Sequence, residues 1–425
     1  MNAAELKNRI VSGGLDEKLT VLYGKDQLEA QKARYTEAVD AFVELYGDRK
    51  NLTLFSAPGR TEIAGNHTDH NHGRVVAASV NMDVIAVVSA NESGSVKIKS
   101  KGYPMDTVEL SDLDAKASEE NKAISLIRGT LSRFVQKGHA VGSFDAYTTS
   151  NVLKGSGLSS SAAFEVLVGT ILSHLYNEGS VDAVEIAKYA QYAENVYFGK
   201  PSGLMDQMAS SVGSVITIDF ADTENPIIEK IDFDMEAMGC ALCIVDVGGN
   251  HADLTHEYAA IPTEMKEVAG FFGRDVLRGV SYRELIANAS RIRAQFGDRA
   301  FLRAVHFVKE NERVGAIVNA LRDKDYPCFL KLVTQSGDSS YRYLQNVYAA
   351  SDPKEQSMAV ALEMAEDLLG GRGAYRVHGG GFGGTTQNFV PFDLLDSFRS
   401  GIESVFGEGS CHVLSIRPLG GVQVL

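Results

Sequence analysis

The stretch that decides the fold is 151-NVLKGSGLSSSAAFEVLVGTILSHLY-176. A strand pattern at 143–150 leads into a turn rich in glycine and serine, and an apolar helical pattern follows directly. The first N–H groups of a helix have no partner within it and lie at the positive end of its dipole, so they can bind an anion. The stretch therefore predicts a phosphate-binding loop. The alternative is a capped helix after a flexible turn.

The pattern around this loop predicts an α+β protein. Periodicity indicates helices at 26–47, 119–137 and within 256–370. Short runs rich in β-branched residues indicate strands between 52 and 110, and again in SVITIDF, IIEKIDF, CALCIVDV and CHVLSIRP. A chain of 425 residues exceeds what one core usually supports. We therefore predict two domains, 1–220 and 221–425.

Composition excludes some classes of partner. The net charge of -14 argues against nucleic acid and against an anionic membrane surface as partners, because both require a basic surface. The sequence shows neither a signal-peptide core nor an apolar run long enough to span a membrane, so we expect a cytoplasmic location. The oligomeric state is left open, and a monomer is compatible. Cys240 and Cys243 lie in an apolar run, so their CxxC spacing predicts core cysteines rather than redox or zinc chemistry.

Two further loops carry concentrated polar or glycine residues. In 65-GNHTDHNHG-73, His67, Asp69, His70 and His72 are all residue types that zinc or iron accepts. The flanking glycines and the two asparagines equally suit a polar loop for another ligand. Near the C-terminus, 377-VHGGGFGG-384 holds more glycine than a turn needs, which indicates close approach of its backbone to a ligand or another loop.

The order of the three loops along the chain carries a resemblance. APGRTEIAGNHTDHNHG at 57–73, GSGLSSSAAFEV at 155–166 and GGGFGG at 379–384 together resemble the GHMP small-molecule kinases, and within them the galactokinases. FGKPSGLMDQMAS at 198–210 and HEYAAIP at 256–262 are similar to further galactokinase segments. The resemblance runs from about residue 50 to the end. It implies a two-domain GHMP kinase fold with the active site between the domains, and ATP and Mg²⁺ as cofactors.

The resemblance also implies roles for particular residues. Asp206 would accept the proton of the sugar hydroxyl, and Arg60 would stand beside it and lower its pKa. Ser161 and Glu194 would hold Mg²⁺, although Glu194 could instead be a solvated helix residue. The sugar would be bound by Asn66, His67, Asp69, Gly203 and Tyr258. The nucleotide phosphates would be bound by Gly155, Ser156, Gly157, Leu158, Ser159, Ser160 and Ser161.

Two positions depart from the galactokinase pattern. Asn66 stands where a glutamate is usual, and His70 stands where a tyrosine is usual. A carboxylate accepts hydrogen bonds at both oxygens, whereas an amide accepts at one group and donates at the other. If Asn66 touches the sugar, Asn66→Glu should then improve the use of galactose. His70 and His72 match no functional position, so we interpret both as polar loop residues.

The implied activity is transfer of the γ-phosphate of ATP to the 1-hydroxyl of galactose. The closest alternative is a kinase for another sugar, such as an N-acetylhexosamine, L-arabinose or a uronic acid. A non-catalytic sugar sensor would have a damaged phosphate loop or no base, and both GLSSSAA and Asp206 are intact. A metal-dependent hydrolase would instead depend on residues 65–73, which we call the histidine loop.

Overall fold

The computed structural model describes residues 1–153, 157–248 and 254–425, and two β-sheets organise these residues. The larger sheet has the strand order β12-β1-β2-β5-β3-β4, with β6 beside β2 and β7 beside β6. The smaller sheet has the order β11-β8-β10-β9. The strands of the larger sheet are β1 (Thr53–Ala64), β2 (Arg74–Ala90), β3 (Ser95–Ser100), β4 (Met105–Glu109), β5 (Phe144–Ser150), β6 (Val215–Asp219), β7 (Ile227–Ile231) and β12 (Val422–Gln423). Those of the smaller sheet are β8 (Cys240–Asp246), β9 (Ala374–Val377), β10 (Thr385–Pro391) and β11 (Cys411–Leu414).

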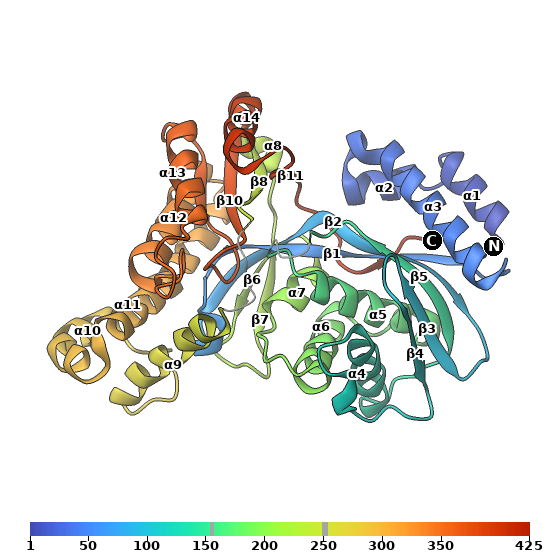
Figure 1. Cartoon of the computed structure of the whole chain (residues 1–425), viewed down its shortest axis with the longest axis horizontal. Helices are drawn as coiled ribbons and strands as arrows, with labels where there is room; N and C mark the ends of the chain where they lie inside the picture. The colour runs from blue at the N-terminus through green and yellow to red at the C-terminus, as the bar shows by residue number, and fades with distance from the viewer. Residues whose placement is uncertain (154–156, 249–253) are drawn as a thin grey trace.

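Helices cover both faces of the larger sheet and surround the smaller one (Figure 1). On one face of the larger sheet lie α1 (Ala3–Val11), α2 (Asp16–Tyr23) and α3 (Leu28–Tyr46). On the other lie α4 (Ala123–Gln136), α5 (Ser160–Tyr176), α6 (Ala183–Tyr192) and α7 (Met205–Val212). The second half contributes α8 (Met235–Met238), α9 (Thr255–Phe271), α10 (Tyr282–Ala287), α11 (Ala289–Arg322), α12 (Tyr326–Ser339), α13 (Ser357–Leu369) and α14 (Leu395–Phe406). Single 3₁₀ or π turns are η1 (Lys25–Gln27), η2 (Asp69–Asn71), η3 (Ala117–Glu119), η4 (Ala193–Phe198), η5 (Ser340–Leu344) and η6 (Phe392–Leu394).

The long hairpin of β1 and β2 connects the two halves of the molecule. The strands pair antiparallel from Thr53 opposite Val88 to Ala64 opposite Val76, and the histidine loop joins them. Because both faces of β1 are covered, nearly all of its side chains are buried. Figure 1 shows that the hairpin runs from beneath α1–α3 across to the helices of the second half. The histidine loop therefore lies where the two halves meet.

The predicted elements are confirmed in type and approximate position. The helix predicted at 26–47 is α3, the one at 119–137 is α4, and the strands predicted before residue 110 are β1–β4. The core prediction for Cys240 and Cys243 is confirmed, since both are buried in β8 without a disulfide. The sequence did not predict α1 and α2, which pack with α3 against the sheet.

The division of the chain at residue 220 remains a prediction. β6 and β7 lie on either side of that residue, yet they pair with each other in the larger sheet. The chain end also crosses between the sheets, because β11 pairs with β8 and β12 pairs with β1.

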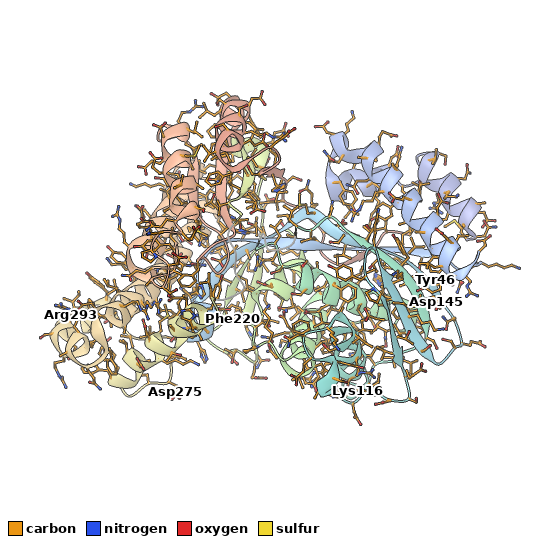
Figure 2. All side chains as sticks on the ribbon, viewed as in Figure 1. Tyr46, Lys116, Asp145, Phe220, Asp275 and Arg293 are labelled. Carbon is orange, nitrogen blue, oxygen red and sulfur yellow. The ribbon has the colours of Figure 1, made fainter. Side chains whose placement is uncertain are left out.

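Side chains fill the space between the layers, and Figure 2 shows Tyr46 of α3 beside Asp145 of β5. No helix within the described ranges is long and apolar enough to cross a membrane.

Candidate active site

Asp206 and Arg60 form an ion pair where α7 meets β1. Arg60 Nε donates to Asp206 Oδ1 at 2.7 Å, and the Ser159 hydroxyl donates to the other carboxylate oxygen. Burial acts to raise the pKa of Asp206, but the charge and hydrogen bond of Arg60, with Ser159 and Lys200, lower it overall. The expected effect of Arg60 on this carboxyl is thus confirmed. The Asp206 side chain is still 28% exposed, so it remains open on one side.

Residues 157–159, the described part of the predicted phosphate-binding loop, form hydrogen bonds with the Asp206–Arg60 ion pair. The Arg60 backbone N–H donates to the Leu158 carbonyl at 3.0 Å, and the Arg60 guanidinium donates to the Gly157 carbonyl. Ser159 precedes α5 in a left-handed conformation, and no side chain caps the helix. The first N–H groups of α5 are therefore left without a side-chain acceptor, as an anion site requires. Gly155 and Ser156, which were predicted to bind phosphate, lie outside the described residues.

Glu194 lies in η4, directly behind the start of α5. Its side chain is 3% exposed, which rules out the alternative of a solvated helix residue. Ser161 Oγ donates to Glu194 Oε1 at 3.2 Å, and Lys200 Nζ pairs with the same oxygen at 3.0 Å. Ser202 and Gln207 donate to Glu194 Oε2 at 2.6 and 2.8 Å. One carboxylate oxygen is thus fixed by neutral donors, and the other faces a cation.

His67 and Asp69 come from the turn between β1 and β2. His67 has a left-handed backbone. Its Nε2 lies 2.9 Å from the carbonyl of Gly380, which belongs to the segment GGGFGG at 379–384, the third glycine motif. Burial raises the pKa of Asp69, and the charge of His67 opposes that effect. A Cβ on Gly203 would stand only 2.0 Å from Asp69 Oδ2. Glycine at 203 therefore allows the segment before Asp206 to approach the histidine loop.

Asn66 is buried, and its side chain bonds to protein atoms. Its Nδ2 donates to Glu62 Oε1 at 2.9 Å and to the Gly379 carbonyl at 2.6 Å. Its Oδ1 accepts from Asn346 Nδ2 at 2.7 Å. Both amide hydrogens and the amide oxygen are therefore engaged, and Asn66 joins the β1–β2 hairpin to the second half of the chain.

The histidine loop does not gather its side chains into a metal centre. Within residues 1–153, 157–248 and 254–425, no three His, Cys, Asp or Glu residues are grouped so as to hold an ion. Burial, with smaller contributions from the nearby cationic side chains, lowers the pKa of His70 to about 3, so the ring is neutral at neutral pH. Its Nδ1 accepts from Asn71 Nδ2 at 3.0 Å, and His72 takes the left-handed turn that ends η2.

The third glycine motif packs against the site. A Cβ on Gly380 would meet the Tyr258 ring at 2.7 Å, and a Cβ on Gly381 would meet the Asn346 carbonyl at 2.1 Å. Tyr258 donates to the Gly381 carbonyl at 2.8 Å and packs edge-on against Phe382 with ring centroids 5.2 Å apart. The close approach predicted for these glycines is confirmed, and the neighbours are other segments of this chain.

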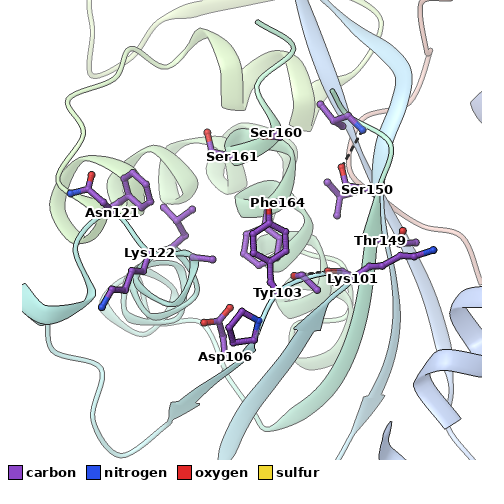
Figure 3. Close-up of a pocket in the computed structure, with 18 residues that line it drawn as sticks. Lys101, Tyr103, Asp106, Asn121, Lys122, Thr149, Ser150, Ser160, Ser161 and Phe164 are labelled. Carbon is purple, nitrogen blue, oxygen red and sulfur yellow. Dashed lines mark hydrogen bonds between the residues drawn. The ribbon is translucent and has the colours of Figure 1, made fainter. Parts of the chain in front are cut away.

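A cavity of about 740 Å³ opens beside the start of α5. Figure 3 shows Ser160 and Ser161 at one end of it, Phe164 in the middle and Asp106 at the other end. Its apolar wall is formed by Val84, Tyr103, Pro104, Leu126, Val152, Phe164 and Phe198. A cavity of this size, with apolar walls and a few polar groups, is typical of a small-molecule site.

Comparisons with known proteins show the family of this chain. The model of the GHMP kinases N-terminal domain matches residues 125–214, and the galactokinase galactose-binding signature matches residues 40–90. A galactokinase from Streptomyces coelicolor is 32% identical over 367 residues, which cover 86% of this chain and 92% of the relative. The chain belongs to the galactokinase family. As a member of that family it is a sugar kinase, and the family uses ATP.

Solved structures of galactokinase-family and related proteins share the fold. The crystal structure of Lactococcus lactis galactokinase complexed with galactose has a TM-score of 0.78 and 25% identity, and the match covers 90% of this chain and 98% of that one. The mevalonate kinase of Methanococcus jannaschii, at 15% identity and a TM-score of 0.61, shows the same fold; that match covers 87% of this chain and 99% of that one. The predicted GHMP kinase fold is thereby confirmed.

The motifs lead to most of the galactokinase-family site but not to all of it. The structure brings together Arg60, Asp69, Ser159, Gly203 and Asp206, which lie in three separate segments of the sequence. Sequence reasoning missed the contacts of Lys200, Gln207 and Asn346, and also the cavity beside α5. Lys200 and Gln207 lie within the quoted segment FGKPSGLMDQMAS, so their position next to Asp206 was a signal. No motif marks Asn346 or the cavity.

Proposed function

We propose that the protein transfers the γ-phosphate of ATP to the 1-hydroxyl of galactose. The observation that carries this proposal is the contact of Arg60 with both Asp206 and the phosphate loop. One arginine thus links the proposed proton acceptor to the loop that would hold the transferred phosphate. Phosphoryl transfer depends mainly on positioning and on charge stabilisation, and this arrangement supplies both.

The nucleotide would place its base and ribose in the cavity beside α5 and its phosphates on the N-terminus of that helix. Residues 157–161, with Gly155 and Ser156, would surround the phosphates. Ser161 Oγ and Glu194 Oε1 offer the oxygen ligands that Mg²⁺ prefers, so the residues present fit this ion. Bound Mg²⁺ would neutralise phosphate charge. Lys200 pairs with the same Glu194 oxygen at 3.0 Å.

Asp206 would accept the proton of the sugar hydroxyl through its exposed side. Its lowered pKa makes it a weak base, so the proton would move late, as the sugar oxygen becomes bonded to phosphorus. The Ser159 hydroxyl and Arg60 hold the carboxylate in one orientation. Arg60 would also offset charge on the transferring group.

The sugar would bind against His67 and Asp69, with Gly203 and Tyr258 beside them. Asp69 can accept from hydroxyl groups, and Gly203 leaves the space for its carboxylate. We propose that Asn66 acts on this pocket by fixing its wall, because its amide already bonds Glu62, Gly379 and Asn346. The amide oxygen accepts from both Asn346 and Ser340, so a direct contact between Asn66 and the sugar would require one of these bonds to break.

A panel of free sugars tests the proposal. The purified chain would be incubated with MgATP and galactose, N-acetylgalactosamine, L-arabinose, galacturonic acid or glucose, and ADP release and the phosphorylated product would be measured. Galactose should give the highest kcat/KM and a 1-phosphate product, and Asp206→Asn provides the inactive control. A higher kcat/KM for another sugar would replace galactose as substrate. Sugar binding without ADP release from any sugar would instead support the non-catalytic sensor.

A further inference from the structure

Asp106 is an acidic side chain at one end of the cavity. It lies on β4, an edge strand of the larger sheet, and its side chain faces inward like that of Val108 two residues later. Figure 3 shows it below Phe164, at the end of the cavity away from Ser160 and Ser161. The phosphate end and the acidic end of the cavity are therefore separated by the aromatic wall.

The carboxylate of Asp106 has no partner within the described part of the chain. It makes no hydrogen bond or ion pair with any residue in those ranges. The two lysines that line the cavity are engaged elsewhere, because Lys101 pairs with Glu37 at 2.7 Å and Lys122 donates to the Ser118 carbonyl at 2.8 Å. Partial burial, with a smaller repulsion from Glu119, raises the pKa of Asp106. A half-buried carboxylate without a donor is costly, so a donor from a ligand would be favourable.

The proposed nucleotide can supply that donor. A purine base fits an aromatic and apolar wall, and adenine carries an exocyclic amino group with two N–H donors. With the phosphates at Ser160 and Ser161, the base would extend past Phe164 toward Asp106. We propose that Asp106 reads the nucleotide base by accepting a hydrogen bond from the 6-amino group of adenine. This inference rests on the proposed function, which places ATP in this cavity.

A different role for Asp106 follows from its position on an edge strand. An inward-pointing charge on such a strand can prevent edge-to-edge pairing with another chain. That role requires a charge on β4 but no nucleotide. It predicts that removal of Asp106 promotes aggregation and leaves base preference unchanged.

Binding of base analogues separates the two roles. The full chain would be titrated, without sugar, with MgATP and with the Mg²⁺ complex of purine riboside 5′-triphosphate, which lacks only the 6-amino group. The wild type should bind ATP about tenfold more tightly, because a hydrogen bond to a charged group is lost with the analogue. Asp106→Ala should bind both nucleotides equally, at the affinity that the wild type has for the analogue. Asp106→Asn, which keeps one acceptor oxygen, should retain a smaller preference.

Glu109→Ala is the matched control, because Glu109 is an exposed acidic residue of the same strand that does not line the cavity. This variant should keep the full preference for ATP. The inference is overturned if the wild type binds both nucleotides equally, if the preference survives in Asp106→Ala, or if GTP binds more tightly than ATP. If Asp106→Ala does not fold, Asp106→Asn decides the outcome. Failure of the wild type to bind any nucleotide would overturn the proposed function instead.

Discussion

Asp206 and Asp83 are both carboxylates paired with arginine, yet their surroundings differ in one respect. Asp83, in β2, accepts from Arg34 at 2.6 Å and from Arg417 at 3.1 Å, and Tyr23 and Ser56 donate to it as well. Its side chain is fully buried, whereas that of Asp206 is 28% exposed. The pKa of each is lowered against the effect of burial.

The difference teaches which of two similar charged pairs can meet a ligand. At Asp83, donors from α2, α3, β1 and the segment after β11 occupy the carboxylate, so it joins four parts of the chain. At Asp206, Arg60 and Ser159 occupy one side and leave the other open to a substrate. Access decides the role, because both carboxylates have similar charge and similar partners.

The largest effect is expected at the open carboxylate. Asp206→Asn should lower kcat by ~10²- to 10⁴-fold, because the proton acceptor is lost while most ligand contacts remain. Calorimetric titration should show sugar and nucleotide affinities close to those of the wild type. An unchanged kcat would show that Asp206 is not the proton acceptor. The difference in exposure between Asp206 and Asp83 would then not separate a reacting carboxylate from a structural one.

The closed carboxylate should affect stability instead. Asp83→Ala should lower the free energy of unfolding by about 3–5 kcal/mol, because Arg34 and Arg417 would be left buried without their partner. Urea unfolding measures this loss. The kcat of the folded fraction should stay close to that of the wild type, and a kcat loss comparable to that of Asp206→Asn would contradict a structural role.

Acid should reduce the contribution of Asp83. Its pKa is lower in the folded protein than the value of about 3.9 for an unfolded chain, so its stabilisation is present above that pH and is lost as the pH falls below it. Below about pH 4, the wild type should therefore lose stability more steeply than Asp83→Asn. Parallel curves for the two proteins would show that Asp83 is not a stabilising anion.

Glu194 is intermediate between Asp83 and Asp206, because it is buried like Asp83 but is proposed to meet a ligand like Asp206. Its side chain is almost as buried as that of Asp83, but Lys200 is its only cationic partner among the described residues, and one oxygen also faces Ser161. Glu194→Ala should raise the Mg²⁺ concentration needed for half-maximal activity by roughly tenfold or more, because an oxygen ligand is lost. Direct titration of Mg²⁺ in the presence of ADP gives a readout independent of turnover. Unchanged metal affinity together with lower stability would assign Glu194 a structural role.

The smallest effect is expected at Asn66, a buried amide whose hydrogen-bonding groups are all engaged, as at Asp83, but which lies in the histidine loop. Asn66→Glu would place a second carboxylate beside Glu62 and remove the donors to Glu62 and Gly379. We therefore expect kcat/KM for galactose to fall about tenfold, which is near 1.4 kcal/mol. This is the opposite of the effect expected if Asn66 touched the sugar. A rise in kcat/KM would restore the direct contact, and Asn66→Ala provides the neutral control.

The sequence alone determined the parts of this protein that depend on local pattern. Periodicity gave α3–α5 and the strands before residue 110, and glycine and serine marked the three loops, because backbone geometry restricts which residues form turns and helix starts. The short helices α1 and α2 were missed, since helices of 9 and 8 residues form mainly through packing against the rest of the protein.

The tertiary structure alone decided which side chains meet. Asn66 bonds Asn346 across 280 positions of the chain, and Arg60 reaches Asp206 across 146. No local pattern encodes such pairs, because they depend on how the two sheets and their helices pack. The same holds for the cavity, whose lining comes from β2, β3, β4, β5, α4, α5 and η4 and from the segments next to them. The sequence thus indicated the groups that are proposed to react, and the packing decided which of them stay open to a ligand.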